Sequence, residues 1–508
     1  MKLKYLILLF MLLRYEGYTQ NKPVELLFNS PKKFNSPSSE SSSVAGKVLI
    51  NLINEATQTI HFAIYGMRSQ PKILNALIRA KKRGVNIYGI VDKDVFDNNY
   101  YSNTEELIDA IKGIKDDYQS DVKYKKNKRS YTNNPYWKRP LGFNGPPSTV
   151  GYSIDNQTAV ISVQASKKEI SFAGNIMHNK FFVFDEEKIW TGSTNISDSG
   201  TGGYNANIST LITSKEIAGF YITEFDQMYF QGKFHNLKNL NSKLERYNNT
   251  HKIQIFFSPQ TKVLSNKIIP LINAAKKTIN VSVFFLTHKN VCGALIDAHR
   301  RGVKVRVIID ASGANNEYTK FQFLRVAGIP VKIENWGGKL HSKAASIDDD
   351  LIILGSMNWT SAGENINDEN TLIIRDLNLA SEYNSFFNDI WNSVPEDWLE
   401  NRPSAESQFS TGSCYDGMDN NYDGQADNFD FNCINQTNEV NKLPPIFIVK
   451  KSEGSGLIKG NISKNGNKIY HLPNQKYYNR VKIDLDNGEY FFANESEARK
   501  LGFRKSKI

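Results

Sequence analysis

Long apolar segments are scarce in this sequence. The N-terminal apolar run, residues 5–13, is nine residues long and follows Lys2 and Lys4. A helix that spans a bilayer needs about 20 apolar residues, so a retained anchor is the less favoured interpretation of this run, and no later segment has the pattern of a membrane span. A basic start with a short apolar run is typical of a secretory signal. We therefore expect residues 1–20 to be a signal peptide, with cleavage near Gln20, and the protein to be secreted or periplasmic.

Cysteine is also rare, with three in 508 residues, so at most one disulfide can form within the chain. Cys414 and Cys433 flank an acidic loop and can pair in an oxidising compartment. Cys292 lies in an apolar helical pattern, which indicates a buried thiol. No set of metal ligands accompanies the catalytic motifs described below, and His471 has no cysteine partner. A catalytic metal and a zinc site are therefore not expected.

The charge of the chain is moderately positive. Lysine and arginine number 63 against 52 aspartate and glutamate residues, which gives a formal net charge of +11 at pH 7. A basic surface favours polyanionic partners, and both nucleic acid and anionic phospholipid fit. The alternative is a basic surface that serves solubility alone. With 40% hydrophobic residues, the chain can bury a large core.

An internal repeat indicates the fold. Residues 55–65 align with 273–284, and the aligned segments continue into 77–92 and 295–310. In both continuations a basic helix end is followed by a glycine and then by a β-branched run typical of a buried strand. Strand, helix and strand in this order predict βαβ units. We therefore expect an α/β fold of two pseudo-symmetric halves, each with a mixed, mainly parallel sheet flanked by helices.

The repeat and changes of composition divide the chain into five segments. An insert in the first half contains a basic and aromatic segment, residues 123–139, which can pair with phosphates and stack on bases. A solvated surface loop is the alternative for this segment. The expected segments are the signal peptide 1–20, a first half 21–250 with the insert at about 94–175, a second half 251–400, a linker with an acidic loop 401–440, and a small α+β module 445–508.

One motif occurs twice, once in each half. In both copies serine follows histidine by 15 positions and asparagine follows it by 17. Identical spacing in two places of one chain indicates a duplicated site. The residues are His178, Lys180, Asp185, Ser193 and Asn195 in the first half, and His341, Lys343, Asp348, Ser356 and Asn358 in the second.

These residue types suit the cleavage of a phosphodiester bond. Alternation along a strand places His178 and Lys180, and likewise His341 and Lys343, on one face. Lysine, serine and asparagine side chains stabilise charge on the non-bridging phosphate oxygens, by about 3 kcal/mol for each donor. One imidazole attacks phosphorus to form a phosphohistidine, while the other protonates the leaving oxygen and then activates water. This chemistry requires no metal.

Over residues 24–391 the sequence resembles the phospholipase D superfamily, whose signature is a doubled HxKxxxxD followed by GSxN. The resemblance implies one active site in a monomer, built by both halves, with His178 and His341 as the catalytic pair. It further implies phosphate contacts from the two lysines and the two asparagines of the motifs. Members of this superfamily cleave phospholipids, DNA or RNA, so the resemblance leaves the substrate open.

Glu369 matches the acid that, in this superfamily, orients the histidine of its own motif. The equivalent stretch of the first half, residues 204–207, has no carboxylate. An anionic partner favours a nucleophilic imidazole, which points to His341, whereas the resemblance assigns the attack to His178. Both assignments stay open. The two motif aspartates, although part of the catalytic signature, are expected to brace the loops around it.

An acidic loop and a small module follow the repeats. The loop is similar to an EF-hand loop and to the Asp-rich calcium repeats of secreted bacterial proteins, which implies structural calcium. Its oxygen ligands would be Asp419, Asn421, Asp423, Asp427 and Asp430. A flexible acidic linker is the alternative. The C-terminal module resembles one found in some secreted bacterial nucleases and has the aromatic and basic composition of a nucleic-acid binder, with a packed His471.

These observations together predict a secreted, metal-independent phosphodiesterase, with nucleic acid favoured as the substrate because charge, insert and C-terminal module all point to it. A phospholipase D that acts on phosphatidylcholine or cardiolipin is the alternative. A third possibility is a binding protein without activity, which the complete motifs disfavour. No protein partner is evident from the sequence.

Overall fold

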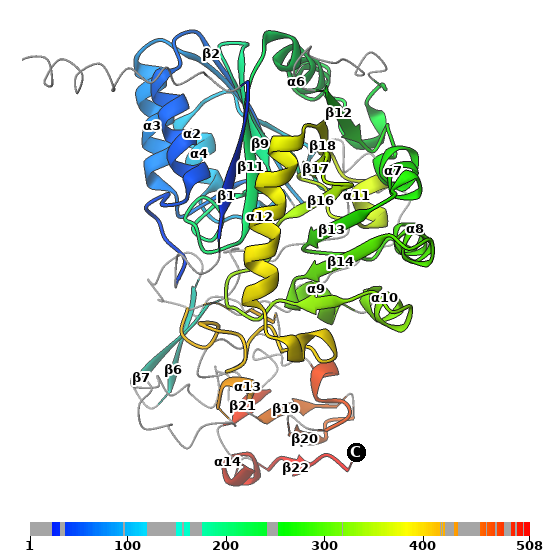
Figure 1. The fold of residues 1–508 in the computed structure, drawn as a ribbon. Coiled ribbons are helices and arrows are strands. Elements are labelled where there is room, and N and C mark those ends of the chain that lie inside the picture. Colours follow the sequence, from blue (N-terminus) through cyan, green and yellow to red (C-terminus); the bar gives the residue numbers. More distant parts are fainter. Residues whose placement is uncertain are drawn as a thin grey trace, which may run out of the picture.

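The computed structural model describes two large α/β halves, the segment that follows them and a small C-terminal sheet (Figure 1). The expected signal peptide, the basic segment 123–139 and most of the acidic loop lie outside the described residues. The described residues are 23–30, 36–94, 97–118, 149–154, 157–162, 175–240, 252–316, 318–416, 418, 420–421, 431–434, 458–463, 465–472, 475–481, 489–492, 495–500 and 502–507.

The first half is built on a seven-stranded sheet. Its strands are β1 (Val24–Asn29), β2 (Thr59–Ile64), β4 (Asn86–Val91), β5 (Lys115–Asp116), β8 (Lys180–Phe184), β9 (Lys188–Gly192) and β11 (Asn207–Thr213), and its helices are α2 (Val44–Glu55), α3 (Pro71–Lys82), α4 (Thr104–Ala110) and α6 (Lys215–Tyr229). The strand order is β1-β11-β9-β8-β2-β4-β5. The apolar faces of α2 and α3 pack on one side of this sheet.

The second half repeats this plan. Its strands are β12 (Lys252–Ser258), β13 (Thr278–Val283), β14 (Lys304–Ile309), β15 (Val331–Ile333), β16 (Lys343–Ile347), β17 (Leu351–Gly355) and β18 (Glu369–Arg375), and its helices are α7 (Ile269–Ala274), α8 (Lys289–Arg300), α9 (Ala311–Asn315), α10 (Phe321–Val326), α11 (Ser361–Asn365) and α12 (Leu377–Ser393). The order β12-β18-β17-β16-β13-β14-β15 matches the first sheet strand for strand. The two pseudo-symmetric α/β halves are therefore confirmed.

Two small sheets lie beside the large ones. Strand β3 (Met67–Arg68) pairs with β10 (Ile196–Ser197), and β6 (Thr149–Ile154) pairs with β7 (Gln157–Ser162). The second pair is an antiparallel hairpin within the expected insert.

The expectation of mainly parallel sheets is wrong. Only β2-β4-β5 and β13-β14-β15 are parallel, and the other four pairings of each sheet are antiparallel. The aligned repeat covered the parallel βαβ part alone. The motif strands instead form hairpins, β8-β9 and β16-β17, whose tight turns can join only antiparallel neighbours.

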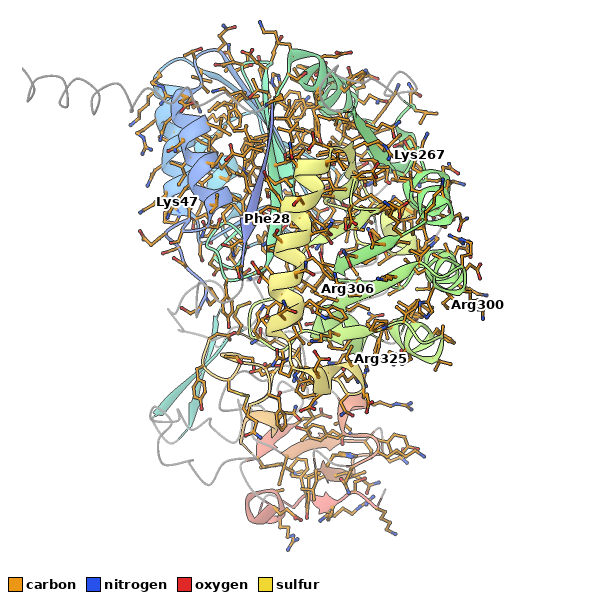
Figure 2. The ribbon with its side chains drawn as sticks, in the orientation of Figure 1. Phe28, Lys47, Lys267, Arg300, Arg306 and Arg325 are labelled. Atoms are coloured by element: carbon orange, nitrogen blue, oxygen red, sulfur yellow. A yellow bond between two sulfur atoms is a disulfide. The ribbon has the colours of Figure 1, made fainter. Side chains whose placement is uncertain are left out.

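The two halves share one core. Helices α6 and α12 contribute to a buried apolar cluster that also contains strands of both sheets. Across this junction the ring of Phe28 on β1 stacks on Phe386 of α12, with ring centroids 4.8 Å apart. Figure 2 labels Phe28 where β1 runs beside α12. Because burial of this apolar surface links the halves, they form a single structural unit.

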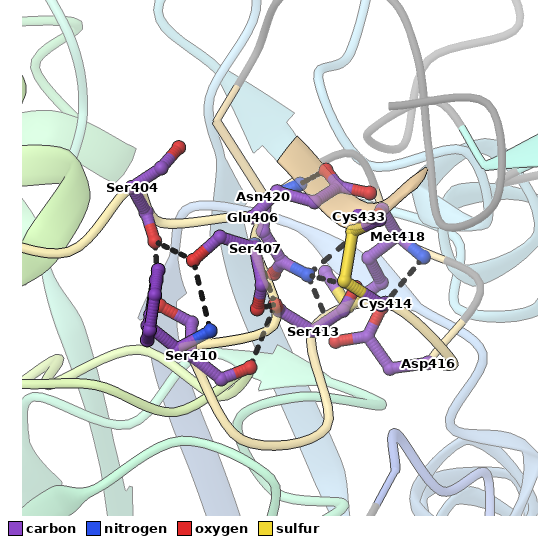
Figure 3. The surroundings of a disulfide bond; sticks show 11 residues. Ser404, Glu406, Ser407, Ser410, Ser413, Cys414, Asp416, Met418, Asn420 and Cys433 are labelled. Atoms are coloured by element: carbon purple, nitrogen blue, oxygen red, sulfur yellow. Dashed lines mark hydrogen bonds between the residues drawn. A yellow bond between two sulfur atoms is a disulfide. The ribbon is translucent and has the colours of Figure 1, made fainter. Parts of the chain in front are cut away.

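Residues 403–416, expected to be a linker, pack against the second half. The side chains of Glu406 and Ser413 are fully buried, and Thr411 forms a bridge with Trp336. Figure 3 shows the hydrogen bonds of this segment around the Cys414–Cys433 disulfide. Serine hydroxyls bond to nearby main-chain atoms throughout it, which gives the segment a fixed structure that its composition did not indicate.

The C-terminal module is a four-stranded sheet with one helix. It contains β19 (Ile458–Ile462), β20 (Lys468–His471), β21 (Tyr490–Phe492), β22 (Arg504–Lys505) and α14 (Glu495–Lys500), and α13 (Phe431–Ile434) precedes it. His471 is packed, and its Nε2 lies 3.0 Å from Asn461 Oδ1. In the described part of the chain, no helix is both long enough and apolar enough to cross a membrane.

Candidate active site

Each motif histidine lies two residues before a strand. Lys180 begins β8 and Lys343 begins β16, so His178 and His341 precede the strands instead of sharing a strand face with the lysines. Each lysine turns back, and its Nζ donates to the carbonyl of its own histidine at 2.8 Å and 2.7 Å. The expected alternation along a strand is therefore wrong, although histidine and lysine still lie together.

The backbone of each histidine is held by the opposite half. His178 N donates to Asp368 O at 3.0 Å, and His341 N donates to Ala206 O at 2.9 Å. Bridges Met177–Asp368 and Ala206–Leu340 surround these bonds. Each histidine is thus fixed beside the residue that precedes the last strand of the other sheet, β18 or β11.

Glu369, the first residue of β18, contacts the histidine of the other motif. Its Oε1 lies 2.7 Å from His178 Nδ1, and its Oε2 accepts a hydrogen bond from Ser356 Oγ at 2.6 Å. The expectation that Glu369 orients His341, the histidine of its own motif, is therefore wrong. Spacing along the chain could not show that β18 reaches across the junction of the halves.

His341 has an uncharged partner in the equivalent place. Its Nδ1 lies 3.2 Å from Asn207 Oδ1 and 3.0 Å from the carbonyl of Ser193. Asn207 begins β11 as Glu369 begins β18, so the two residues are counterparts. The sequence showed the missing carboxylate of the first half but not this contact, which only the three-dimensional arrangement supplies.

The electrostatics of the site show that both motifs share one location. Burial lowers the pKa of His178 well below its ordinary value, and the ammonium groups of Lys180 and Lys343 lower it further. Burial, Lys343, Lys180 and His178 likewise lower the pKa of His341. Groups that repel one another in this way must lie close together. The two copies of the motif therefore meet, as the resemblance implied.

Burial also perturbs the lysines and the acid. It lowers the pKa of Lys180 to about 7, against the attraction of Glu369, and it lowers the pKa of Lys343, as does Lys180. Burial raises the pKa of Glu369 to about 8 in spite of both lysines. A desolvated group of mutually repelling cations gains most from an anion placed among them, and a phosphate group meets this need.

The asparagines and serines of the motifs differ in what they contact. The Oδ1 atoms of Asn195 and Asn358 are buried without a hydrogen-bond partner among the described residues. By contrast, Ser193 Oγ donates to Asn207 at 2.9 Å and Ser356 Oγ donates to Glu369. The two hydroxyls thus orient the residues behind the histidines, which corrects the expectation that they contact phosphate directly.

The motif aspartates lie away from the site. The carboxylate of Asp185 accepts bonds from the backbone N–H groups of residues 57–59, and that of Asp348 accepts from residues 276–278. Each follows a five-residue strand whose start lies at the site, so about 16 Å of strand separates it from the chemistry. The expectation that Asp185 and Asp348 belong to the catalytic residues is therefore wrong. Instead, both carboxylates brace the hairpin turns.

Two further aspartates support the motifs. Asp92 Oδ1 accepts from Met177 N at 2.8 Å, and Asp310 Oδ2 accepts from Leu340 N at 2.9 Å. Both residues directly follow the parallel strands β4 and β14. The signal for them was present in the sequence, because each ends a segment of the aligned repeat.

Aromatic rings flank both histidines. The rings of Tyr65 and His178 meet edge to face with centroids 5.4 Å apart, and those of Phe284 and His341 lie 5.1 Å apart. Tyr100 and Tyr101 pack against Tyr65. An aromatic wall therefore adjoins the first histidine.

The calcium prediction stays untested. Asn421 is described, but Asp419, Asp423, Asp427 and Asp430 lie outside the described residues. Within the described parts of the chain, no cluster of three or more histidine, cysteine or acidic residues has the arrangement of a metal site.

The chain is similar to several known proteins. The family model "Cardiolipin synthase, PLD-like domain" matches residues 49–229 and 268–391. A phospholipase D of Rickettsia felis is 34% identical over 158 residues, which cover 29% of this chain and 77% of that protein. A mitochondrial cardiolipin hydrolase of Chlamydomonas reinhardtii is 28% identical over 127 residues, 25% of this chain and 57% of that protein, so the match spans little more than half of its length. The structure of the phospholipase D family member Nuc from Salmonella typhimurium is 27% identical and covers 28% of this chain and 97% of that chain, with a TM-score of 0.27.

Proposed function

Because the chain belongs to the phospholipase D superfamily and is a phosphodiester hydrolase, we propose that it is a secreted nuclease that cleaves DNA or RNA through a phosphohistidine and without a metal. The observation that carries the mechanism is the 2.7 Å contact between His178 Nδ1 and Glu369. It makes the two histidines chemically different and assigns a role to each.

His178 is the nucleophile. Burial raises the pKa of Glu369 to about 8, so the reactive form is the fraction of molecules in which this carboxyl is ionised. In that form Nδ1–H donates to the carboxylate, and Nε2 keeps its lone pair and attacks phosphorus. The bond from Nε2 to phosphorus forms as the bond from phosphorus to the leaving oxygen breaks. The carboxylate then stabilises the positive charge on the phosphorylated ring. His341, whose partner is a neutral amide, lacks this stabilisation.

His341 is the general acid and then the general base. The bound phosphate is an anion among cations, so it raises the pKa of His341 and keeps the ring protonated until the leaving oxygen takes the proton. In the second step His341 removes a proton from water, whose oxygen attacks phosphorus and displaces His178. The products are an alcohol and a phosphomonoester, and His341 is protonated again.

The lysines and asparagines hold the non-bridging oxygens. Lys180 and Lys343 place two ammonium groups beside the histidines, and the side-chain NH₂ groups of Asn195 and Asn358, which the family resemblance assigns to phosphate, would donate further hydrogen bonds. These groups are preorganised by burial, so they stabilise the charge of the transition state without first reorganising water.

Nucleic acid is the favoured substrate. The net charge of +11 suits a polyanion, and Tyr100, the partly exposed member of the aromatic wall, offers a ring on which a base can stack. The Cys414–Cys433 disulfide supports an oxidising compartment and hence secretion. Phosphatidylcholine or cardiolipin is the second candidate, because relatives are named phospholipase D and cardiolipin hydrolase.

One side-by-side assay tests the proposal. The full chain is incubated in EDTA with plasmid DNA, RNA, and vesicles of phosphatidylcholine or cardiolipin. We expect cleavage of nucleic acid that His178→Asn and His341→Asn abolish and that the control His299→Asn, on the last turn of α8, retains. Activity on the vesicles alone would establish the second candidate.

The nucleophile is tested by trapping. Acid quench during turnover of a labelled substrate, followed by peptide mapping, locates the phosphoryl group. We expect it on His178, and recovery on His341 would refute the role assigned to Glu369.

A further inference from the structure

A fully buried ionic cluster lies directly behind Glu369. His235 Nδ1 is 3.0 Å from Asp368 Oδ2, and His235 Nε2 is 3.2 Å from Asp117 Oδ2. Lys238 Nζ lies 2.6 Å from Asp368 Oδ1 and also contacts Glu224. The side chains of Asp117, Asp368 and Lys238 are completely excluded from solvent. None of these residues belongs to the repeated motifs.

Asp368 connects this cluster to the nucleophile. Its carbonyl accepts from His178 N at 3.0 Å, and its own N–H donates to Ile176 O at 2.9 Å. Its side chain accepts from the backbone N–H of His235 at 2.9 Å, and its Oδ2 lies 3.0 Å from Nδ1 of the His235 ring. Glu369 is the next residue along the chain. A movement of Asp368 therefore displaces both the ring partner of His178 and the backbone that carries that ring.

Two carboxylates flank the ring of His235. Asp368 Oδ2 lies 3.0 Å from Nδ1 and Asp117 Oδ2 lies 3.2 Å from Nε2, and this pair of anions favours the imidazolium form. Burial opposes ionisation of Asp368, but Lys238 and His235 hold the pKa of that carboxyl below its ordinary value. The two carboxylates come from different halves, Asp117 from the first and Asp368 from the second. The imidazolium thus ties one half to the other.

Among the residues that the structure describes, the cluster has no counterpart behind His341. The pseudo-symmetric position of Asp368 is Ala206, as the paired bridges show, and that of Glu369 is Asn207. The two acids Asp368 and Glu369 therefore occur together with the basic side chains of His235 and Lys238, next to His178 and not next to His341. This asymmetry links the cluster to the chemistry of His178, because a purely structural tie between halves would be useful on both sides.

The two halves also differ in the pair of carboxyl groups that follows their parallel strands. Register places Asp92 beside Asp117 in the first half and Asp310 beside Glu334 in the second. In the second half burial and Asp310 raise the pKa of Glu334 well above its ordinary value, so that pair retains a proton. In the first half the corresponding carboxylate of Asp117 pairs with a histidine instead.

We propose that His235 is a positioning residue, which clamps Asp368 against Asp117 and thereby holds Glu369 and the ring of His178 in line for attack on phosphorus. The inference rests on the proposed nucleophilic role of His178. It assigns no contact between His235 and the substrate.

The backbone of His235 limits the choice of variant. Its φ of 52° lies in the left-handed region, where asparagine is among the residues that are tolerated. His235→Asn therefore keeps the backbone while it removes the positive charge. Asp117→Asn keeps the shape of the other side chain and leaves its Oδ1 to accept from Lys93 N as Asp117 does.

The test measures kcat and KM of the full chain with bis(4-nitrophenyl) phosphate, together with thermal unfolding. For His235→Asn we expect kcat to fall about 10- to 100-fold, because small displacements of a reacting group cost rates of this size. KM should change by less than about threefold, since phosphate binding by the lysines is unaffected. Asp117→Asn should give a smaller loss of kcat, and His299→Asn should match the wild type.

Two results overturn the inference. One is an unchanged kcat in a folded His235→Asn protein, or in Asp117→Asn if the first variant does not fold. The other is a rise of KM with kcat retained, which would mean that the cluster serves substrate binding. A wild-type protein that hydrolyses no phosphodiester would instead refute the proposed function and, with it, the role of His235, so the two failures are distinguishable.

Discussion

Replacement of Glu369 by glutamine tests the chemical difference between the two histidines. Ser356 Oγ accepts from Asn370 N and donates to Glu369 Oε2 at 2.6 Å, much closer than its other acceptor, Asn370 O at 3.4 Å, so this hydroxyl favours an oxygen at the position of Oε2. In Glu369→Gln the amide oxygen satisfies Ser356, and the amide NH₂ must then face His178 Nδ1. The variant therefore reverses the tautomer of His178 and places the proton on the nitrogen that should attack.

The size of the loss follows from this geometry. A histidine held in the wrong tautomer by an amide in place of its carboxylate loses about 10³- to 10⁴-fold in kcat, roughly 4 to 5 kcal/mol of transition-state stabilisation. In the double variant with Ser356→Ala, the amide is free to rotate and present its oxygen to His178. We expect that variant to recover at least about tenfold, a non-additive effect typical of residues in contact.

Although Glu369→Gln should lower kcat, it should raise the free energy of unfolding. Burial raises the pKa of Glu369 to about 8, so the folded protein retains a proton that the unfolded chain releases near pH 4. Between these values the folded state binds more protons than the unfolded state, and the free energy of unfolding decreases as pH rises. Glutamine does not titrate, so Glu369→Gln should gain stability relative to the wild type between pH 5 and pH 8.

The assay combines single-turnover kinetics with urea unfolding at several pH values. The reasoning is refuted if Glu369→Gln keeps kcat within about threefold of the wild type, because a tautomer reversal cannot be that mild. It is also refuted if Ser356→Ala fails to restore any activity in the folded double variant.

Further predictions concern Asp185, the Cys414–Cys433 disulfide and the effects of EDTA and calcium. Asp185→Ala should lower the free energy of unfolding by about 1 to 2 kcal/mol with kcat retained, as urea unfolding and kinetics would show. In the wild type, burial raises the pKa of Asp185, but hydrogen bonds from the backbone N–H groups of residues 57–59 lower it further than burial raises it. The stability that the Asp185 carboxylate contributes should therefore be present above about pH 4 and be lost as pH falls further. Cys414→Ser, which opens a loop of 19 residues, should cost on the order of 3 kcal/mol, and an unchanged thermal midpoint would contradict this. EDTA should leave kcat unchanged, because the proposed chemistry uses no metal. Calcium should protect residues 416–430 from proteolysis, and equal protection without calcium would contradict the prediction of a calcium-binding loop.

The sequence predicted those features that depend on short-range pattern. The repeat that ends at Asp92 and Asp310 gave the parallel part of each sheet, and the glycines after the helices, Gly84 and Gly302, have positive φ as helix ends require. The motif spacing gave the histidines and lysines of the site. These features are local, so the order of residue types along the chain is enough to define them.

The sequence could not predict the features that depend on contacts between the halves. Glu369 was matched to the nearer histidine in sequence, whereas β18 extends across the junction to His178. His235 carried no signal at all, because its two partners lie 118 and 133 positions away in the chain. The segment 403–416 read as a linker because its many serines are typical of loops, and only its packing shows that these hydroxyls are satisfied internally.

The placement of each last strand against the opposite histidine has a consequence for how the duplicated halves diverged. A substitution at the start of β11 or β18 changes the ring partner of the histidine in the other half. Under the proposed mechanism, asparagine at 207 and glutamate at 369 give the two duplicated histidines different roles, one attacking and one donating a proton. Neither half can replace the other, because each supplies the side chain that contacts the catalytic histidine of the other half.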